Sequence, residues 1–160
     1  MIKNKGKQIL ILLLVLLLAL CLPACRKKDQ SKTEPSGSSQ AEASLDRSGS
    51  YDQKDDVALY LHLYGELPEN YMTKKEARKL GWNGGSLEDY APGKCIGGDH
   101  YGNYEGNLPS DDNYRECDID TLGKKKRGAK RIVYSDDGDI YYTEDHYNHF
   151  TQLYDEEGEL

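Results

Sequence analysis

The spacing of apolar residues predicts two helices at the start of the folded region. Between positions 52 and 64 they recur as on a helix with one buried side: Val57, Ala58, Tyr60, Leu61 and Tyr64. Gly65 is a natural end for this helix. Thr73 and Glu76 have the spacing of a capping box, so a second, shorter helix is expected directly after Thr73.

From Lys94 onward the pattern changes to short strands. Ser86 and Asp89, spaced like a further cap, predict one last helical turn before this change. Segments rich in Gly, Asp and Asn then separate five short runs, at residues 95–100, 114–120, 131–135, 139–143 and 150–153. Asp137-Gly138 is a hairpin turn signal between two of them. Helices followed by strands predict an α+β domain, with N-terminal helices packed on one face of a C-terminal antiparallel sheet.

The N-terminus has the pattern of an export signal, which we place at residues 1–25. Three lysines precede an apolar run at residues 9–22 that is too short to span a bilayer comfortably. The run ends in Leu22-Pro23-Ala24-Cys25, which resembles a bacterial lipobox, so Cys25 is expected to be lipidated. The alternative is ordinary cleavage after Ala24 and release into the medium.

Composition and charge set the rest of the domain plan. Residues 26–50 carry almost no large apolar side chains and are interpreted as a flexible tether. A folded domain at 51–154 and an acidic tail at 155–160 follow. Residues 51–160 hold 13 Lys and Arg against 24 Asp and Glu, a net charge of −11. Such a charge argues against a non-catalytic RNA-coating protein, whose affinity would come from neutralising phosphates.

A group of reactive side chains near the C-terminus has the chemistry for cutting RNA without a metal. Glu116 can accept the proton of a ribose 2′-hydroxyl, and His146 can protonate the departing 5′-oxygen. Arg127 and Arg131 lie in the basic run KKKRGAKR and can hold the charge that builds on phosphorus. The substrate would be RNA, because DNA lacks the attacking hydroxyl.

Several long segments of the sequence are similar to those of the barnase-type family, the guanyl-preferring extracellular ribonucleases of bacilli. They occur in the family's order over residues 57–153: LPENYMTKKEARKLGW, APGKCIGGD, EGNLP, RECDID, RIVYSDD and TEDHYNHF. The resemblance implies metal-free transesterification to a 2′,3′-cyclic phosphate, followed by hydrolysis. It implies single-stranded RNA as the substrate, a preference for the 3′ side of guanosine, a monomer without a cofactor, and a barstar-like intracellular inhibitor.

The resemblance also assigns the catalytic residues. Glu116 becomes the general base and His146 the general acid, and the two exchange roles during hydrolysis. Arg127 and Arg131 bind the scissile phosphate, while Lys74 stabilises the transition state. Cationic neighbours would keep Glu116 ionised at neutral pH.

Supporting roles follow in the same way. Asp99 orients Lys74 and Glu116, Asp118 holds the two arginines, and Tyr147 closes the pocket around the phosphate and base. The loop from Tyr101 through Gly102, Asn103 and Tyr104 to Glu105 binds the base: its backbone amides and the Glu105 carboxylate face the guanine edge. Asn103 fixes the shape of this loop.

Two departures from the family bear on the site. Tyr104 replaces the family's usual arginine, which removes a cation and leads us to expect a weaker base preference and an altered inhibitor. One extra residue between Asp120 and Arg131 leaves Lys126 as an alternative to Arg127 for the phosphate ligand.

Other motifs give weaker signals. Residues 136–139 lack the alternating ligands of a calcium loop, and the histidines do not have zinc-site spacing, so no metal site is expected. If Asp99 faces Glu116 across an antiparallel pair, Cys95 and Cys117 fall on opposite faces of the sheet and stay free thiols. Two other functions remain open on this fold: a catalytically inactive binding module, and a toxin against competitor cells.

Overall fold

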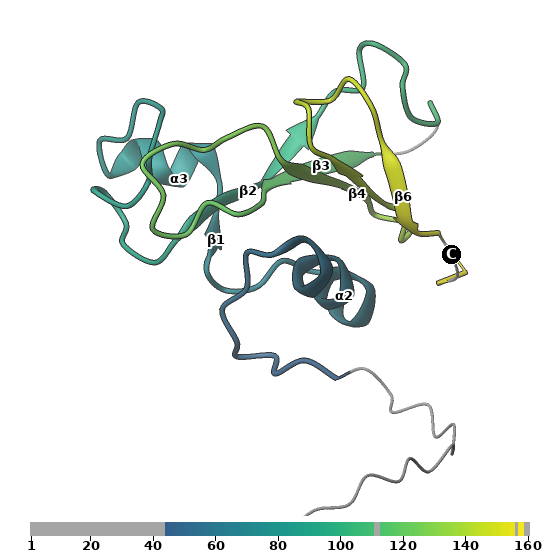
Figure 1. The fold of residues 1–160 in the computed structure, drawn as a ribbon, viewed down its shortest axis with the longest axis horizontal. Coiled ribbons are helices and arrows are strands. Elements are labelled where there is room, and N and C mark those ends of the chain that lie inside the picture. The colour runs from purple at the N-terminus through teal and green to yellow at the C-terminus, as the bar shows by residue number, and fades with distance from the viewer. Residues whose placement is uncertain (1–43, 111–112, 156, 159–160) are drawn as a thin grey trace, which may run out of the picture. The chain divides into compact units, whose positions relative to one another are not determined.

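The computed structural model describes residues 44–110, 113–155 and 157–158, and the two helices and six strands in this part of the chain form one α+β domain (Figure 1). The expected export signal, the possible lipid site at Cys25 and most of the expected tether lie outside the described residues. The elements are α2 (Lys54–Tyr64), β1 (Tyr71–Met72), α3 (Lys74–Lys79), β2 (Cys95–Tyr101), β3 (Tyr114–Asp118), β4 (Arg131–Ser135), β5 (Ile140–Thr143) and β6 (Thr151–Tyr154).

The end of α2 and the start of α3 lie where the sequence indicates, and α2 begins two residues after the expected start at position 52. Asp55 and Asp56 lie in the first turn of α2, where their negative charges interact favourably with the positive end of the helix dipole. Gly65 ends the helix with a left-handed φ of 67°. At α3, Thr73 and Glu76 form the complete capping box. These local signals were sufficient because caps depend on residues only a few positions apart.

The further turn predicted from Ser86 is present as a single helical turn. The Ser86 hydroxyl accepts a hydrogen bond from Glu88 N, and Leu87 O accepts from both Tyr90 N and Ala91 N. The turn carries Leu87 into a small core with Ala77 of α3. This core fixes α3 beside the sheet.

The six strands form one sheet in sequential order, β1 to β6. All neighbouring pairs are antiparallel except β1 and β2, which are parallel. The sequence did not predict β1, because two residues are too few to show a periodic pattern. Strands β2 to β6 match the five predicted runs, with ends that differ by a few residues, and the α+β prediction is confirmed.

The two faces of the sheet have different partners. Val57, Ala58 and Leu61 of α2 pack onto one face, against Ile132 and neighbouring side chains of β3 to β5 (Figure 1). The other face carries an aromatic cluster: Tyr101, Leu108, Tyr114, Val133 and Tyr141, with Tyr147 and Phe150 packed against it. Because alternate residues point to opposite faces, Glu116 and Arg131 share this second face with Val133.

A β-bulge in β2 decides which residues reach that second face. The pairing shifts between Gly97, which faces Cys117, and Asp99, which faces Glu116. Gly98 is the extra residue and has a φ of 86°, a conformation that costs glycine little. The bulge therefore turns Asp99 toward Glu116 while Gly97 stays on the face covered by α2.

The bulge also corrects the expected position of the cysteines. Cys117 lies opposite Gly97, so Cys95, two residues before Gly97, shares its face with Cys117. Both cysteines are nevertheless free, as predicted, although the reason given for the prediction was wrong. The structure also shows that both are buried. Burial raises the pKa of Cys95 to about 11 and raises that of Cys117 as well.

Packed structure begins earlier than the expected boundary at residue 51. The hydroxyls of Tyr60 and Tyr64 donate hydrogen bonds to the carbonyls of Arg47 and Leu45, at 2.8 and 2.5 Å. Arg47 also pairs with Glu66 at 2.6 Å.

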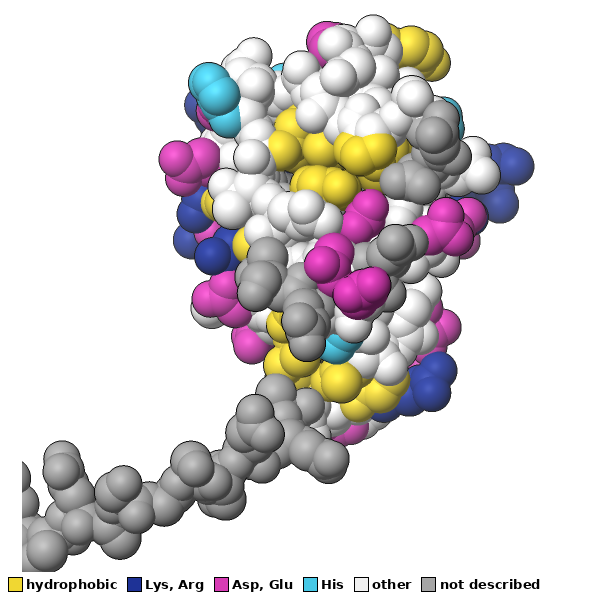
Figure 2. Space-filling view, turned by 90° about the vertical axis from the view of Figure 1, so that its right-hand side faces the viewer, with side chains coloured by type: hydrophobic (Ala, Val, Ile, Leu, Met, Phe, Trp, Pro, Cys, Tyr) yellow, Lys and Arg dark blue, Asp and Glu magenta, His cyan; other side chains and the backbone are white. Residues whose placement is uncertain are grey.

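Among the described residues, no helix is both long and apolar enough to cross a membrane. Figure 2 shows acidic side chains close together on the side of the domain that carries β6.

Candidate active site

A cavity of about 350 Å³ opens on the face of the sheet that α2 does not cover. Strands β2, β3 and β4, the start of α3 and three loops all contribute to its wall. The lining residues are Lys74, His100, Tyr101, Gly102, Asn103, Tyr104, Glu105, Glu116, Arg127, Arg131, His146 and Tyr147. All of them except His100 were assigned to the site from the sequence.

Glu116 lies at the centre of this wall. Its side chain is almost buried on β3, and its two carboxylate oxygens have separate partners: the Lys74 ammonium on one and the Tyr147 hydroxyl on the other. Lys74 is the first residue of α3, and its backbone N–H donates to Asp99 Oδ2 at 2.8 Å. Asp99 therefore holds the backbone of Lys74 by a hydrogen bond, while its carboxylate does not line the cavity.

Tyr147 is tied into the same arrangement. Burial raises the pKa of its phenol, and the hydrogen bond to the Glu116 carboxylate raises it further. The hydroxyl is therefore a proton donor to Glu116 at neutral pH. Its ring stacks on Tyr101, with centroids 5.2 Å apart.

Asp118 anchors both arginines from beneath the cavity. Arg127 Nε and Nη2 donate to its two oxygens at 2.5 and 2.7 Å, a bidentate pair. Arg131 Nε lies 2.9 Å from Oδ1 without hydrogen-bond alignment, and its Nη1 donates to Lys130 O at 2.6 Å. Burial opposes the charge of Arg127, but the bonds and charge of Asp118 raise its pKa overall.

The geometry decides which residue of the basic run reaches the cavity. Arg127 lines it, with its guanidinium also over the ring of Trp82 at 5.7 Å, whereas Lys126 is exposed and absent from the wall. Arg131 is almost fully buried, so Arg127 and Lys74 present the more accessible cations. The contact between Trp82 and Arg127 was not predicted, because the two residues lie 45 positions apart in the sequence.

His146 and Tyr147 lie on a tightly turned loop after β5. Both have left-handed backbone angles, with φ of 60° and 72°. The Thr143 hydroxyl accepts from Tyr147 N at 3.0 Å, and it donates to Asp145 Oδ1 at the same distance. The loop thus presents an exposed His146 at the cavity while Tyr147 turns inward.

Asp145 does not pair with the adjacent His146. Its carboxylate accepts from His149 N at 3.0 Å and lies 2.6 Å from His149 Nδ1. Side-chain and backbone hydrogen bonds from His149 lower the pKa of Asp145 to about 2. The sequence interpretation gave His149 no role, although the i, i+4 spacing of this pair was visible.

The loop assigned to base binding is held by Asn103, as the resemblance implied. Asn103 has a φ of 45°, its Nδ2 donates to Leu108 O at 2.8 Å, and its Oδ1 accepts from Leu108 N at 3.1 Å. Glu105 and Tyr104 are exposed on this loop. The fixed loop contributes Tyr104 and Glu105 to the wall of the cavity.

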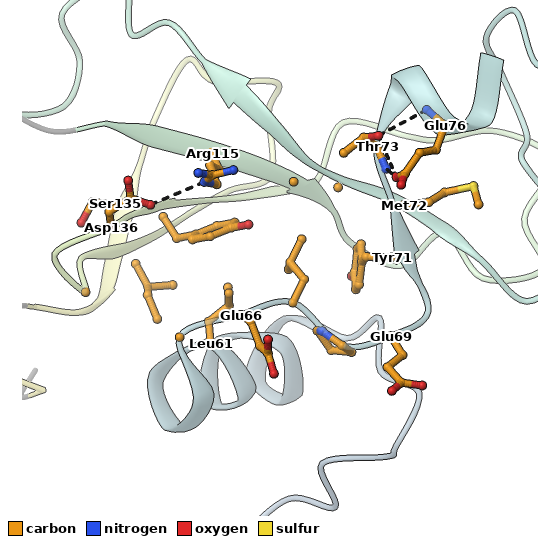
Figure 3. Close-up of a pocket in the computed structure, with 18 residues that line it drawn as sticks. Leu61, Glu66, Glu69, Tyr71, Met72, Thr73, Glu76, Arg115, Ser135 and Asp136 are labelled. Carbon is orange, nitrogen blue, oxygen red and sulfur yellow. Dashed lines mark hydrogen bonds and ion pairs between the residues drawn. The ribbon is translucent and has the colours of Figure 1, made fainter. Parts of the chain in front are cut away.

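A larger cavity of about 540 Å³ lies elsewhere, between the C-terminal end of α2 and the sheet (Figure 3). Leu61 and Tyr71 contribute apolar surface, and an exposed ion pair of Arg115 with Asp136, 3.5 Å long, lies at its side. It shares no residue with the cavity at Glu116. Size alone would therefore select the wrong cavity as the candidate active site.

Comparison with known proteins finds ribonucleases, which agrees with the chemistry of the side chains around Glu116. Residues 54–154 match the family model described as ribonuclease. A ribonuclease of Bacillus intermedius is 50% identical over 103 residues, which cover 62% of this chain and 63% of that protein. A ribonuclease of Heyndrickxia coagulans is 48% identical over 103 residues, which cover 62% of this chain and 94% of that protein.

A third relative is the guanyl-specific ribonuclease St of Saccharopolyspora erythraea. It is 44% identical over 50 residues, which cover 30% of this chain and 50% of the relative. The chain thus spans somewhat less than two thirds of the length of the Bacillus intermedius protein but nearly all of the Heyndrickxia coagulans protein. From the family match over the whole helical and strand region, together with the carboxylate, histidine and cations gathered at one cavity, we conclude that the chain belongs to the barnase-type microbial ribonuclease family.

Proposed function

We propose that this protein is an endoribonuclease that cleaves single-stranded RNA on the 3′ side of guanosine. The central observation is the setting of Glu116, whose carboxylate sits between Lys74 and Tyr147 in a cavity shared with Arg127 and His146. A base, an acid and cations around one space of about 350 Å³ fit a reaction at a phosphodiester.

In the first step, Glu116 takes the proton from the ribose 2′-hydroxyl. The 2′-oxygen attacks phosphorus, and the bond from phosphorus to the 5′-oxygen breaks. His146 gives its proton to that oxygen, which leaves as a hydroxyl group and yields a 2′,3′-cyclic phosphate. The exposure of His146 suits this role, because the leaving group must be able to depart into solvent.

In the second step the roles of the two residues reverse. His146, now neutral, takes a proton from water, the water oxygen attacks phosphorus, and Glu116 returns its proton to the departing 2′-oxygen. Lys74 and Arg127 stabilise the extra negative charge on the phosphoryl oxygens in both steps. Asp118 keeps Arg127 in place with its bidentate pair, so little reorganisation is needed when the phosphate arrives.

The preference for guanosine is assigned to Glu105. Guanine presents two adjacent donors, N1–H and N2–H, which match the two oxygens of a carboxylate. Adenine presents an acceptor at the corresponding ring nitrogen, which a carboxylate would repel. The relative from Saccharopolyspora erythraea, whose name describes it as guanyl-specific, supports this preference.

The deciding experiment follows an oligonucleotide with a single GpU step, incubated with EDTA and the full domain. Wild type should give a 2′,3′-cyclic phosphate detectable by mass spectrometry, and His146→Ala should give none within the same time. His62→Ala is the matched control, because His62 lies on α2 and stacks on Tyr154 away from the cavity. A folded wild type without activity would favour the catalytically inactive binding module.

We also propose that the protein is exported and carries a lipid on Cys25. The charged start, the apolar run and the lipobox-like segment support this proposal. Labelling of producing cells with a fatty acid should mark the wild type and not Cys25→Ala. Unlabelled protein in the medium that begins at Cys25 would support the alternative of cleavage after Ala24. A barstar-like inhibitor belongs to the same proposal, because an active precursor would attack the RNA of the cell that makes it.

A further inference from the structure

Two residues of the candidate site lie on a turn whose backbone needs support. His146 and Tyr147 have left-handed φ values of 60° and 72°, and neither is a glycine. Such angles are unfavourable for a residue that carries a Cβ, and they persist only where the surrounding structure fixes them. The direction of the His146 imidazole follows from this backbone. The contacts that hold the turn therefore decide how the proposed general acid meets its substrate.

The carboxylate of Asp145 is the centre of the contacts within this turn. Its Oδ1 accepts hydrogen bonds from the Thr143 hydroxyl and from His149 N, each at 3.0 Å. The Thr143 oxygen accepts in turn from Tyr147 N, also at 3.0 Å. These bonds join the residues before His146 to those after it, so the carboxylate holds the turn closed.

His149 supplies the contact that fixes the second oxygen of Asp145. Its Nδ1 lies 2.6 Å from Oδ2. With its pKa lowered to about 2, Asp145 is ionised at neutral pH and can only accept, so Nδ1 of His149 carries the hydrogen. The His149 side chain is 89% exposed, and within the described part of the chain its ring makes no other hydrogen bond or ion pair. The single partner of this ring is the carboxylate that holds the turn.

Contacts from two other loops limit what the loss of His149 can do. His146 N donates to Ala129 O at 3.3 Å, and Asn107 Nδ2 donates to Tyr147 O at 3.2 Å. Neither bond involves Asp145. Removing the His149 ring should therefore loosen the turn and leave the domain folded, so the effect is expected in the rate of the reaction.

On the basis of the proposed function, we propose that His149 is a positioning residue for the reaction, which acts through Asp145 on His146. His149 keeps the Asp145 carboxylate on its own side of the turn, and Asp145 keeps the His146 backbone in its left-handed conformation. Without the His149 ring, Oδ2 loses its partner and the carboxylate is free to rotate toward the adjacent His146. The imidazole then loses part of its orientation toward the departing 5′-oxygen.

The kinetic test follows cleavage of GpU by His149→Ala, by Asp145→Ala and by the double variant. His149→Ala should lower kcat by about 2- to 5-fold, the factor that an exposed hydrogen-bonded pair can supply. Asp145→Ala removes all these bonds and should lower kcat by about 10- to 100-fold, because a misplaced catalytic group is costly. KM should change little, because Lys74 and Arg127 lie on other elements.

Two comparisons show whether His149 acts through Asp145. The double variant should be no slower than Asp145→Ala, because the route from His149 is already cut. His149→Asn should restore most of the rate, since its amide nitrogen can donate from the place of Nδ1. His62→Ala is the control, because His62 stacks on Tyr154 away from the cavity. Wild-type kcat in His149→Ala, or losses that multiply in the double variant, would overturn the inference.

Hydrogen exchange separates this inference from the proposed function, because it needs no catalysis. The Tyr147 N–H is bonded to Thr143 within the turn, so its exchange followed by NMR reports how often the turn opens. Exchange should be about 2- to 5-fold faster in His149→Ala and unchanged in His62→Ala. Equal exchange in wild type and His149→Ala would refute the positioning role, whether or not the domain cleaves RNA. Faster exchange in a domain that cleaves no RNA would instead refute the proposed function alone.

Discussion

Replacing Asp118 by asparagine should destabilise the domain far more than the same change at Asp120. Asp118 is the last residue of β3 and Asp120 lies two residues beyond it; both pair with cations, but their surroundings differ. Asp118 is 1% exposed and holds Arg127 and Arg131, while Asp120 pairs with Lys130 at 2.5 Å on the surface. Asparagine preserves the shape and removes the charge, so each variant isolates the ion pair.

The expected magnitude follows from burial. Removing one partner of a buried ion pair leaves the other charge buried without compensation, which costs about 3–5 kcal/mol. Arg131 cannot escape to solvent, because its side chain is only 3% exposed. The exposed pair at Asp120 is worth about 0.2–1 kcal/mol. For a domain of this size, the loss at Asp118 corresponds to a fall in Tm of roughly 12 °C or more.

Urea unfolding followed by tyrosine fluorescence and circular dichroism measures both free energies of unfolding. The slope m should be unchanged, so that the difference appears in the midpoint. Asp120→Asn is a fair control because asparagine accepts the left-handed φ of 59° at that position. Equal losses in the two variants, or a loss below about 1 kcal/mol at Asp118, would show that burial does not govern the strength of this pair.

Three further predictions concern the reaction, its specificity and pH. Glu116→Gln should lower the rate of transesterification by about 10²- to 10⁴-fold in an assay of cyclic phosphate formation, and wild-type rates would reject Glu116 as the base. Tyr104→Arg should raise the ratio of kcat/KM for GpU over ApU, because arginine can donate to guanine O6 and N7; an unchanged ratio would show that this position does not read the base. The carboxyl of Asp145 should titrate by NMR near a pKa of about 2, and His149→Ala should move that pKa up toward its ordinary value. Because the folded pKa is lowered, the contribution of Asp145 to stability is present above about pH 4 and is lost as the pH falls toward 2.

The sequence predicted those parts of the fold that depend on neighbouring residues. The capping box at Thr73 and the stop at Gly65 are local, and both appear as expected. The bulge at Gly98 was not predicted, because the sequence does not indicate which of the two adjacent glycines is left out of the strand pairing. The register with β3 determines that this residue is Gly98. The predicted face of the sheet for Cys95 was wrong for the same reason, because one extra residue in a strand moves the following side chains to the opposite face.

The candidate site was predicted mainly from sequence segments that resemble those of the barnase-type ribonuclease family, and its chemistry was inferred from the residue types. Glu116, His146 and Arg127 lie together as expected. The supports of the site were harder to foresee. Trp82 meets Arg127 only through the fold, and the carboxylate of Asp145 turns to His149 instead of His146, because the loop backbone directs it there. Such details depend on backbone angles that residue types do not specify.

The burial of the two cysteines has a practical consequence for following the opening of the domain. With a pKa of about 11, Cys95 carries roughly one thiolate in ten thousand molecules at pH 7, and Cys117 is shielded at least as strongly. Thiol reagents attack the thiolate, so they will label these positions only when β2 and β3 separate. The chain therefore contains two internal reporters whose rate of labelling measures how often the centre of its sheet opens.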